Sequence, residues 1–329
     1  MLPREIQEAF RGRSALVTGG TGMIGRCVVR ALVESGAKVT SASLDDVQVD
    51  ADATHIKADL TDLEQCRSMV SEKDFVFHVA GIKGSVEMTI QRPASFFVPL
   101  AMMNTNVLEA CRASGVERVV YVSSIGAYGS AEVFVESDEF ETSPPMDRYP
   151  GWAKRMGELQ VQAYKEQYGL QYSVVRPSNV YGPGDNFDPE SAMVIPTLMA
   201  RIARGDDPVL VWGDGAAIRD FAYADDVAEG IVRAMHFGTR TRYVNLGSGV
   251  GVSIKELIET LAEFLEFAPH FDVSKPSGYP RRVMSIEQAQ EQLGYEPAVS
   301  LRQGLERTWE WFQANRDQHL KKQNYLGGA

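Results

Sequence analysis

A glycine-rich loop near the N-terminus constrains the fold of this chain more than any other feature. Residues 18–25 read TGGTGMIG; they follow the apolar segment 14–18 and precede a helical pattern that ends near Gly36. A second apolar strand is predicted at 38–42. A strand, a glycine loop, a helix and a second strand in this order, within about 30 residues, indicate a βαβ unit that binds a dinucleotide. The alternative is a glycine-rich turn that only packs.

Each glycine of the loop has a separate role in such a unit. Gly19 permits the tight turn, Gly22 lets a pyrophosphate approach the backbone, and Gly25 lets the helix pack against the strand. The helical stretch follows the loop, so its N-terminus, with free N–H groups and the positive end of the helix dipole, faces the phosphates beside Met23 and Ile24 of the loop. We therefore expect these five residues to bind the phosphates of the cofactor.

Strands and helices alternate along the rest of the first half of the chain. Apolar strands are predicted at 74–81, 117–129 and 172–184, and helices at about 99–114 and 151–168. Strands without polar alternation are typical of a sheet that is buried on both faces. The alternation with helices implies right-handed crossovers. The predicted fold class is therefore α/β, with a Rossmann doubly wound parallel sheet.

The composition and patterning of the sequence change after Gly184, where proline and short helical patterns become more frequent. A helix at 220–237 and a strand at 242–249 return to the earlier pattern, which indicates a smaller, interleaved C-terminal substrate domain. The predicted domains are 1–184 with 220–249 for the dinucleotide, and 185–219 with 250–329 for the substrate.

Charge and composition exclude several classes of protein. The chain has 329 residues and a formal net charge of -11, with no basic stripe, so a nucleic-acid partner is not expected. It has no apolar run of membrane-spanning length and no apolar signal core before Arg13, which predicts a cytoplasmic protein without a membrane partner. Its three cysteines form no metal-ligand cluster, so no metal is expected.

The end of the second strand indicates which dinucleotide binds. Ser43 stands where an acidic residue commonly binds the ribose 2′-hydroxyl, and Asp45 follows closely. No arginine lies between Lys38 and Asp52, and carboxylates without an arginine repel a 2′-phosphate. These residues favour NAD, with NADP not excluded. Asp59 and Leu60 suit a contact with the adenine edge, or alternatively belong to a helix N-cap.

Several motifs together resemble one large family. The chain is similar to the extended short-chain dehydrogenase/reductases of the NAD-dependent sugar epimerase/dehydratase family, and within it to the GDP-L-fucose synthase subgroup. The motifs that carry the resemblance are TGGTGMIG, ADLTD, Val79–Gly81, Asn106, VSSIGAYG, GWAKRMGEL, RPSNVYGPGDNF and WGDGAAIRDFAYADDVAEGI. The resemblance implies an enzyme that acts on a nucleotide-diphosphate sugar, with Ala80 and Gly81 beside the cofactor.

The resemblance also implies a catalytic serine, tyrosine and lysine. The tyrosine is the general acid/base, and the lysine lowers its pKa and binds the nicotinamide ribose. Ser124 fits the serine position, because it stands four residues before Tyr128, and Lys154 fits the lysine position. The usual Tyr-x-x-x-Lys spacing puts both side chains on one face of a helix.

The tyrosine position departs from this pattern. Pro150 stands four residues before Lys154, and Tyr149 stands five before. In one interpretation Pro150 begins the helix, so that Tyr149 lies outside regular helical geometry and its ring reaches the catalytic position. In the other, Tyr149 is a surface or lid residue, and Tyr128, a substrate hydroxyl or water is the acid. We select Ser124, Tyr149 and Lys154 as the catalytic residues.

Two other departures narrow the reaction. The positions of the cysteine and histidine that move protons at C3 and C5 in the GDP-L-fucose synthases are Gly126 and Met193 here. Neither side chain transfers a proton, so 3,5-epimerisation by that route is not expected. Ile125 and Gly126 also replace the Asp-Glu pair of the 4,6-dehydratases. Hydride chemistry at C4 remains, as a 4-ketoreductase or a 4-epimerase.

The substrate residues follow from the same resemblance. Asn179, the backbone of Val194, Arg219 and either Arg281 or Arg282 match positions that bind the sugar or its diphosphate. Lys83 contacts substrate or caps a helix. A turn role for Asn179 and solvated surface roles for the arginines are the alternatives.

Two further expectations concern assembly and function. The family often pairs the helices predicted at 99–114 and 151–168 into a four-helix homodimer interface. The apolar positions with suitable spacing are Met102, Met103, Val107, Leu159 and Ala163, although packing inside one subunit explains them equally well. The alternative function, suggested by Pro150, is a dinucleotide-binding sensor or scaffold with a degenerate catalytic centre.

Overall fold

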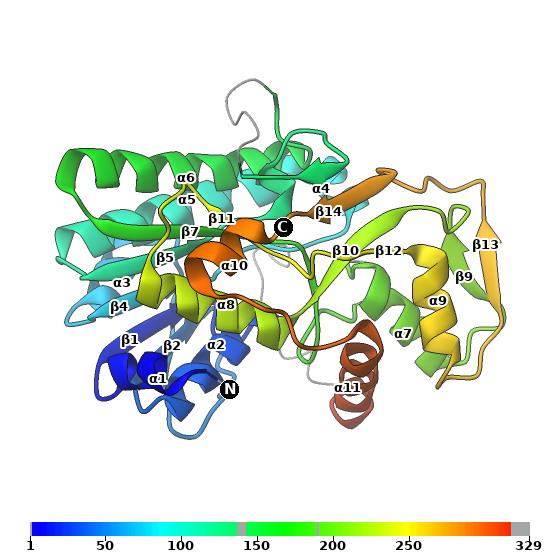
Figure 1. Ribbon diagram of the computed structural model, residues 1–329, viewed down its shortest axis with the longest axis horizontal. Coiled ribbons are helices and arrows are strands. Elements are labelled where there is room, and N and C mark those ends of the chain that lie inside the picture. The colour runs from blue at the N-terminus through cyan, green and yellow to red at the C-terminus, as the bar shows by residue number, and fades with distance from the viewer. Residues whose placement is uncertain (1, 137–142, 189–190, 317–329) are drawn as a thin grey trace.

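A seven-stranded parallel sheet is the centre of the structure, a computed structural model that describes residues 2–136, 143–188 and 191–316 (Figure 1). All neighbouring strands in it are parallel, which confirms the predicted Rossmann α/β fold. In spatial order the strands are β11 (Val244–Leu246), β7 (Gln171–Pro177), β5 (Arg118–Val122), β4 (Phe75–His78), β1 (Ser14–Thr18), β2 (Lys38–Ser43) and β3 (Thr54–Lys57).

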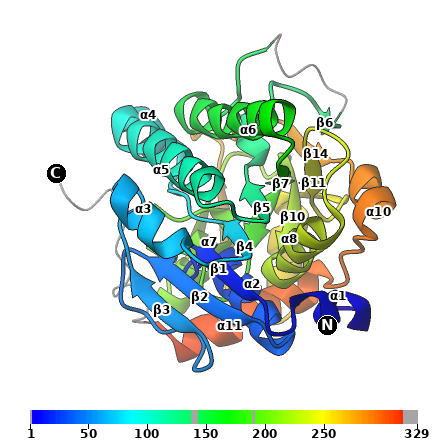
Figure 2. The ribbon, with the colours of Figure 1, turned by 90° about the vertical axis from the view of Figure 1, so that its left-hand side faces the viewer.

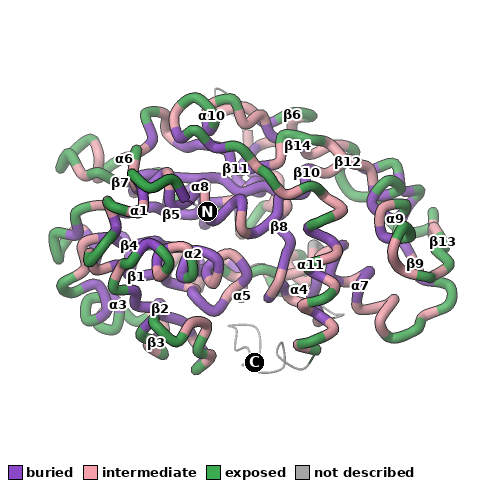
Figure 3. Tube along the Cα trace, turned by 60° about the horizontal axis from the view of Figure 1, so that its bottom comes forward, coloured by how far each residue is buried: buried purple, intermediate pink, exposed green. Residues whose placement is uncertain are grey.

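Helices cover both faces of this sheet (Figure 2). One face carries α3 (Leu63–Val70), α5 (Pro93–Ala113) and α6 (Arg148–Tyr168). The other carries α1 (Arg4–Phe10), α2 (Met23–Glu34), α8 (Ala224–Phe237) and α10 (Glu287–Leu293). The central strands between them are almost wholly buried, as the purple trace in Figure 3 shows, because apolar side chains point to both faces.

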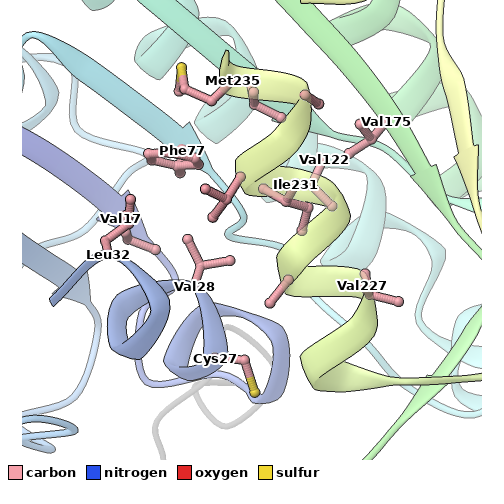
Figure 4. Close-up of a cluster of buried hydrophobic side chains, with 14 of the residues drawn as sticks. Val17, Cys27, Val28, Leu32, Phe77, Val122, Val175, Val227, Ile231 and Met235 are labelled. Atoms are coloured by element: carbon pink, nitrogen blue, oxygen red, sulfur yellow. The ribbon is translucent and has the colours of Figure 1, made fainter. Parts of the chain in front are cut away.

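The contact between α2 and α8 shows how one face is closed. Val28 and Leu32 of α2, Val227 and Ile231 of α8 and the sheet residue Phe77 belong to one apolar cluster, and all five side chains are fully buried (Figure 4). Burying such side chains contributes roughly 1.5–3 kcal/mol each. This packing holds the N-terminal end of α2, and with it the glycine loop, against the sheet.

Two smaller sheets, built mostly from the C-terminal half of the chain, lie at one end of the molecule (Figure 1). The larger contains β12 (Gly251–Ser253), β10 (Ile218–Tyr223), β14 (Arg281–Met284) and β6 (Val133–Phe134), with β8 (Asn179–Tyr181) paired to β10. The other pairs β9 (Val209–Trp212) with β13 (Pro269–Asp272). The remaining helices are α4 (Val86–Gln91), η1 (Ile125–Ala127), α7 (Val194–Arg204), α9 (Ile254–Ala262) and α11 (Leu301–Ala314).

Asp220 of β10 ties these smaller sheets to the main one. Its Oδ1 accepts hydrogen bonds from Ser178 Oγ at 3.2 Å and from the backbone N–H of Ser248 at 2.7 Å, and its Oδ2 accepts one from the N–H of Met284 at 3.3 Å. Burial raises the pKa of this carboxyl, whereas the hydrogen bonds lower it. The network joins the segments that follow β7 and β11 to the last residue of β14.

Several predicted elements differ in extent from the observed ones. The helix predicted at 220–237 begins only at Ala224, because residues 218–223 pair with three neighbouring strands as β10. The helix predicted from residue 99 begins at Pro93, so that Pro99 lies inside it. The strand predicted at 172–184 is divided into β7 and β8.

The predicted division into two domains stays a prediction. Most of the second set of segments shares an apolar cluster that includes Leu198, Leu257 and Leu305. The α10 helix lies in the predicted substrate segment but packs in the cluster of α2 and α8. Residues 317–329 of that segment lie outside the described residues. No helix in the described part of the chain is long and apolar enough to cross a membrane.

Gly157 lets α6 lie unusually close to β5. A Cβ atom at residue 157 would stand 2.5 Å from Cζ of Tyr121, and the Tyr121 hydroxyl donates a hydrogen bond to the backbone oxygen of Lys154 at 3.2 Å. The ring of Tyr121 is fully buried and has no room to move aside.

We predict that Gly157→Ala lowers the free energy of unfolding by about 1–3 kcal/mol, because the added methyl overpacks this contact. Alanine has the higher helix propensity, so an unstrained site would give the opposite sign. Urea denaturation measures the change, with Glu166→Ala on the exposed side of α6 as the control. A Gly157→Ala protein as stable as the wild type would contradict the close packing.

Candidate active site

The loops that follow β1, β4 and β5 meet at one edge of the main sheet, because the carboxyl ends of parallel strands lie together. Gly19 has a φ of +69°, and a Cβ atom there would stand 2.7 Å from Cα of Ala80. The N–H of Ala80 donates to Thr18 Oγ1 at 3.3 Å. The glycine loop and the predicted cofactor residue Ala80 therefore lie in direct contact.

The glycine loop leads directly into α2. Gly22 is the N-cap residue, the helix begins at Met23, and no side chain caps this helix end. A Cβ atom on Gly25 would collide with the backbone oxygen of Gly19, so the turn needs glycine at this position. The N-terminal N–H groups of α2, which include that of Ile24, are therefore available to an anion.

The residues at the end of β2 are hydrogen-bonded to the same loop. Ser43 Oγ accepts a hydrogen bond from the N–H of Thr21 at 3.2 Å, and Asp45 Oδ2 accepts one from Thr21 Oγ1, also at 3.2 Å. Asp45 is buried, whereas Asp46 forms an exposed ion pair with Lys57. The structure thus brings Ser43 and Asp45 beside the predicted phosphate loop and leaves Asp46 outside it.

Asp59 and Leu60 form a turn before α3. Asp59 Oδ1 accepts hydrogen bonds from the N–H and the hydroxyl of Thr61, and the backbone oxygen of Leu60 accepts one from Asn106 Nδ2 at 3.1 Å. Asp62 is the N-cap residue of α3. Asp62 therefore caps the helix, and Asp59 braces the turn that precedes it.

Lys154 lies at the centre of the candidate site. Its Nζ donates a hydrogen bond to the backbone oxygen of Val122, the last residue of β5, at 2.8 Å, and a Cβ atom on Gly81 would stand 3.5 Å from Nζ. Burial lowers the pKa of this ammonium to about 8, and the nearby Glu158 carboxylate opposes the shift. The predicted cofactor residue Gly81 and the predicted catalytic lysine are therefore neighbours.

A buried ion pair lies one helical turn beyond Lys154. Both oxygens of Glu158 accept hydrogen bonds from Arg176 of β7, at 2.8 and 2.6 Å, and Glu158 also accepts one from Ser123 Oγ. The side chains of Glu158 and Arg176 are 0% and 1% exposed. The Arg176 guanidinium lies 3.6 Å from the ring centroid of Tyr243. This network joins α6 to the residue that precedes Ser124.

A second buried chain of hydrogen bonds starts from the glycine loop. His78 Nδ1 lies 2.8 Å from Thr18 Oγ1, its Nε2 lies 3.0 Å from Asn104 Oδ1, and Asn104 Nδ2 donates to the backbone oxygen of Ala153 at 3.2 Å. Burial, together with the charge of Lys154, lowers the pKa of His78 to about 3, so the imidazole is neutral. The chain connects β1, β4, α5 and α6.

Ser124 lies at the same sheet edge, directly after β5. Its Oγ accepts a hydrogen bond from the N–H of Gly126 at 3.1 Å, which begins the short helix η1. Tyr128, one of the alternative acids, is buried away from this edge and donates to Asn245 Oδ1 at 2.9 Å. Because burial raises the pKa of Tyr128 well above its ordinary value, this phenol is a structural group.

Tyr149 and Lys154 lie on different sides of α6. The α6 helix begins at Arg148, so the predicted start at Pro150 is wrong and Tyr149 lies within the regular first turn. Five helical residues separate Tyr149 from Lys154 by roughly 140° around the helix. The Tyr149 ring is 36% exposed and packs edge-on against Phe97 of α5, with centroids 6.5 Å apart. This arrangement matches the interpretation of Tyr149 as a surface residue.

The two predicted phosphate-binding arginines are neighbours. Arg219 of β10 and Arg282 of β14 are register partners, whereas Arg281 pairs with Ile218. Arg219 donates to the backbone oxygen of Tyr279 at 2.7 Å, and burial together with the charge of Arg282 lowers its pKa to about 10. Arg282 Nη2 donates to Asp147 Oδ1 at 3.2 Å. The arrangement therefore favours Arg282 over Arg281.

The other predicted substrate residues have partners within the fold. Asn179 Nδ2 donates to the backbone oxygen of Asp220 at 3.0 Å, as expected of a turn-bracing side chain. Lys83 Nζ forms an ion pair with the buried Asp185 at 3.1 Å and does not cap a helix. Val194 is the first residue of α7, whose N-terminus no side chain caps.

Comparison with known proteins gives the family. The model of the NAD dependent epimerase/dehydratase family matches residues 15–247. The chain belongs to this family. It is 33% identical to GDP-L-fucose synthase 1 of Arabidopsis thaliana over 310 residues, which cover 91% of this chain and 93% of the relative.

Two other members of the family have different activities. The chain is 30% identical to the dTDP-4-dehydro-6-deoxy-D-allose reductase of a Streptomyces species, with 94% of this chain and 99% of the relative covered. The solved structure of UDP-glucose 4-epimerase from Thermotoga maritima, with UDP-glucose, superposes with a TM-score of 0.80 and 30% identity, and covers 92% of this chain and 99% of that chain. Both matches span nearly the whole length of the family member.

Sequence reasoning missed several polar residues of the site. Glu158 follows Lys154 by one helical turn, and an acidic residue at that spacing was a usable signal. Arg176 stands inside an apolar strand, which also marks a buried and paired charge. Asp147 and His78 gave no local signal, because their partners come from distant segments of the chain.

We predict that Glu158→Gln lowers the free energy of unfolding by about 3–5 kcal/mol, because Arg176 is then left buried without its countercharge. Thermal or urea unfolding measures the change. Adding Arg176→Met to Glu158→Gln removes the unpaired charge and restores part of the loss. Glu8→Gln breaks the exposed Arg4–Glu8 pair and serves as the control, with an expected change of about 0–1 kcal/mol. A Glu158→Gln protein within that control range would contradict the account.

Proposed function

We propose that this chain is an NAD-dependent enzyme that acts at C4 of a nucleotide-diphosphate sugar, as a 4-ketoreductase or a 4-epimerase without 3,5-epimerisation. The observation that carries the proposal is the position of Lys154, whose buried Nζ lies beside Gly81 and at the end of the strand that leads into Ser124. The reductase and the 4-epimerase among the relatives support chemistry at C4.

The residues of this chain fit NAD. The α2 N-terminus has no side-chain cap, and glycines line the turn that a pyrophosphate approaches. Asp45 carries a buried carboxylate beside that turn, which favours a free ribose 2′-hydroxyl over a 2′-phosphate. When bound, the nicotinamide accepts or supplies the hydride. Lys154 binds the nicotinamide ribose, and Ser124 orients the reacting sugar oxygen.

The nucleotide-diphosphate sugar is held by the C-terminal segments, which we propose as the substrate domain. Arg219 and Arg282 stand side by side, and paired guanidinium groups suit phosphate oxygens. Asn179 and the uncapped N-terminus of α7 at Val194 add neutral donors. The cytoplasmic location inferred from the sequence stays a prediction.

The direct test of this function mixes the protein and NAD with UDP-, GDP- and dTDP-sugars and follows absorbance at the NADH wavelength and the sugar product. A change in the redox state of the nicotinamide, or a C4 epimer, is the expected result. The exposed position of Tyr149 favours the alternative function, a dinucleotide-binding sensor with a degenerate catalytic centre. That alternative predicts ligand binding with no turnover for any of these sugars.

We predict that NAD affinity falls above about pH 8, because burial holds the pKa of Lys154 at about 8 and its neutral amine is a weaker donor to the ribose. Lys154→Met binds NAD about tenfold or more weakly near neutral pH and lacks this pH dependence, since a charged hydrogen bond contributes about 1.5–3 kcal/mol. Calorimetric dissociation constants near neutral and alkaline pH measure both effects. Equal pH dependence in the two proteins would show that Lys154 does not contact the cofactor.

We also propose that the protein is a homodimer through α5 and α6. Trp152, Met156 and Leu159 form an outward stripe on α6 and are 42%, 43% and 44% exposed, and Met102 of the adjacent helix α5 is 44% exposed. Ala163 is exposed as well. Met103 and Val107, by contrast, are buried inside the subunit and belong to its own core. An apolar surface of this kind suits a second copy of the same helices.

We predict that Trp152→Glu with Met156→Glu converts the dimer to a monomer, because two charges would be buried at its centre. Sedimentation or light scattering measures the mass. Phe237→Glu on α8 is the matched control, since Phe237 is 48% exposed on a different face and its change leaves the mass unaltered. A wild-type protein that is already monomeric at micromolar concentration would rule out this interface.

A further inference from the structure

The side chain of Asp147 does not cap α6, although Asp147 occupies the N-cap position. Asp147 is the N-cap residue, where an aspartate commonly accepts a hydrogen bond from the N–H of the second or third helical residue. The third helical residue is Pro150, which has no N–H. No side-chain cap bond is present at this helix end. The carboxylate is therefore directed elsewhere.

The carboxylate of Asp147 lies in the space of a missing side chain at Gly126. A Cβ atom built on Gly126 would collide with Oδ2 of Asp147, and the Asp147 N–H donates to the backbone oxygen of Gly126 at 3.2 Å. Gly126 in turn donates its N–H to Oγ of Ser124. Asp147, which precedes α6, thus places its carboxylate where a side chain of Gly126 would lie. Gly126 stands two residues after Ser124 and has only a hydrogen atom at that position.

Arg282 holds this carboxylate by one oxygen. Its Nη2 lies 3.2 Å from Oδ1, and the side chains of Arg282 and Asp147 are 11% and 36% exposed. Among the described residues, Oδ2 of Asp147 has no hydrogen-bond partner. The carboxylate is therefore oriented by one oxygen and available through the other, beside the arginines that we assign to the diphosphate.

We propose that Asp147 is the acid/base group for the reacting sugar hydroxyl. It takes the role that the family gives to a tyrosine four residues before Lys154, where this chain has Pro150. This inference rests on the function proposed above. Tyr149 lies on the outward face of α6 and Tyr128 is bonded to Asn245, so neither phenol supplies the proton. Pro150 stands where the family has the tyrosine, and because it has no N–H, the Asp147 carboxylate does not form the usual N-cap hydrogen bond with the third helical residue.

The proton and electron balance of the step is simple. In the oxidising direction the sugar O–H bond breaks and its proton passes to Oδ2 of Asp147. The electron pair of the C4–H bond leaves as a hydride to NAD, which is reduced, and C4 becomes a carbonyl carbon. In the reducing direction the hydride returns to C4 and the carboxylic acid of Asp147 gives its proton to the carbonyl oxygen.

The first experiment measures turnover in Asp147→Asn, Tyr149→Phe and the control Asp206→Asn, which breaks an Asp–Arg pair at the surface. We expect kcat to fall about 10²–10⁴-fold in Asp147→Asn, the usual effect of losing a general acid/base, and to change little in Tyr149→Phe. A Tyr149→Phe protein that loses turnover while Asp147→Asn keeps it would overturn the proposal.

The second experiment measures binding and needs no turnover. With NAD present, calorimetry compares UDP-glucose with UDP and GDP-L-fucose with GDP. Asp147→Ala is expected to weaken a bound sugar nucleotide about fivefold or more relative to its nucleoside diphosphate, because only the sugar reaches Asp147, and any effect through Arg282 is common to both ligands. Unchanged affinity for all four ligands overturns the proposal. A wild type that binds none of the four refutes the proposed function itself, and the role of Asp147 with it.

Discussion

The close approach of α6 to β5 is the constraint on which the rest of the site depends. Gly157 allows the helix to lie on the ring of Tyr121, and this spacing lets Lys154 Nζ reach the carbonyl of Val122. One turn further on, Glu158 meets Ser123 and Arg176 in the same buried layer. Because the ion pair is fully desolvated, its partners have a single favourable arrangement, and the end of β5 is held in register with the helix.

The N-terminal end of α6 shows how one residue changes several others. Pro150 removes both a side-chain acid and a backbone N–H at the third helical position. The helix nevertheless begins before it, which turns Tyr149 onto the outward stripe with Trp152 and leaves the Asp147 carboxylate to Arg282 and Gly126. The chain thus lacks a tyrosine at position 150, but it has the carboxylate of Asp147 at the same edge of the sheet.

Local patterns predicted the features that depend on neighbouring residues. The glycine loop and the parallel sheet follow from short motifs with a known mechanical role, and Ser124 and Lys154 were selected by the resemblance to the family. The sequence predicts residues 220–223 as the start of a helix, because the pairing of segment 218–223 with β8, β12 and β14 depends on segments far away in the chain. The Asp147–Arg282 pair joins residues 135 positions apart, so no local pattern could reveal it. The orientation of the Tyr149 ring could not follow from the sequence alone, because a change of one residue in a helix start rotates a side chain by about 100°.

A crystal structure of the protein with NAD and a nucleotide sugar tests the central claim most directly. The account predicts the nicotinamide ribose at Lys154, and the reacting sugar oxygen within hydrogen-bond distance, roughly 2.6–3.2 Å, of both Ser124 Oγ and Asp147 Oδ2, with the Tyr149 ring still against Phe97. A complex in which the Tyr149 hydroxyl lies at that oxygen, with Asp147 turned away from the sugar, would contradict it.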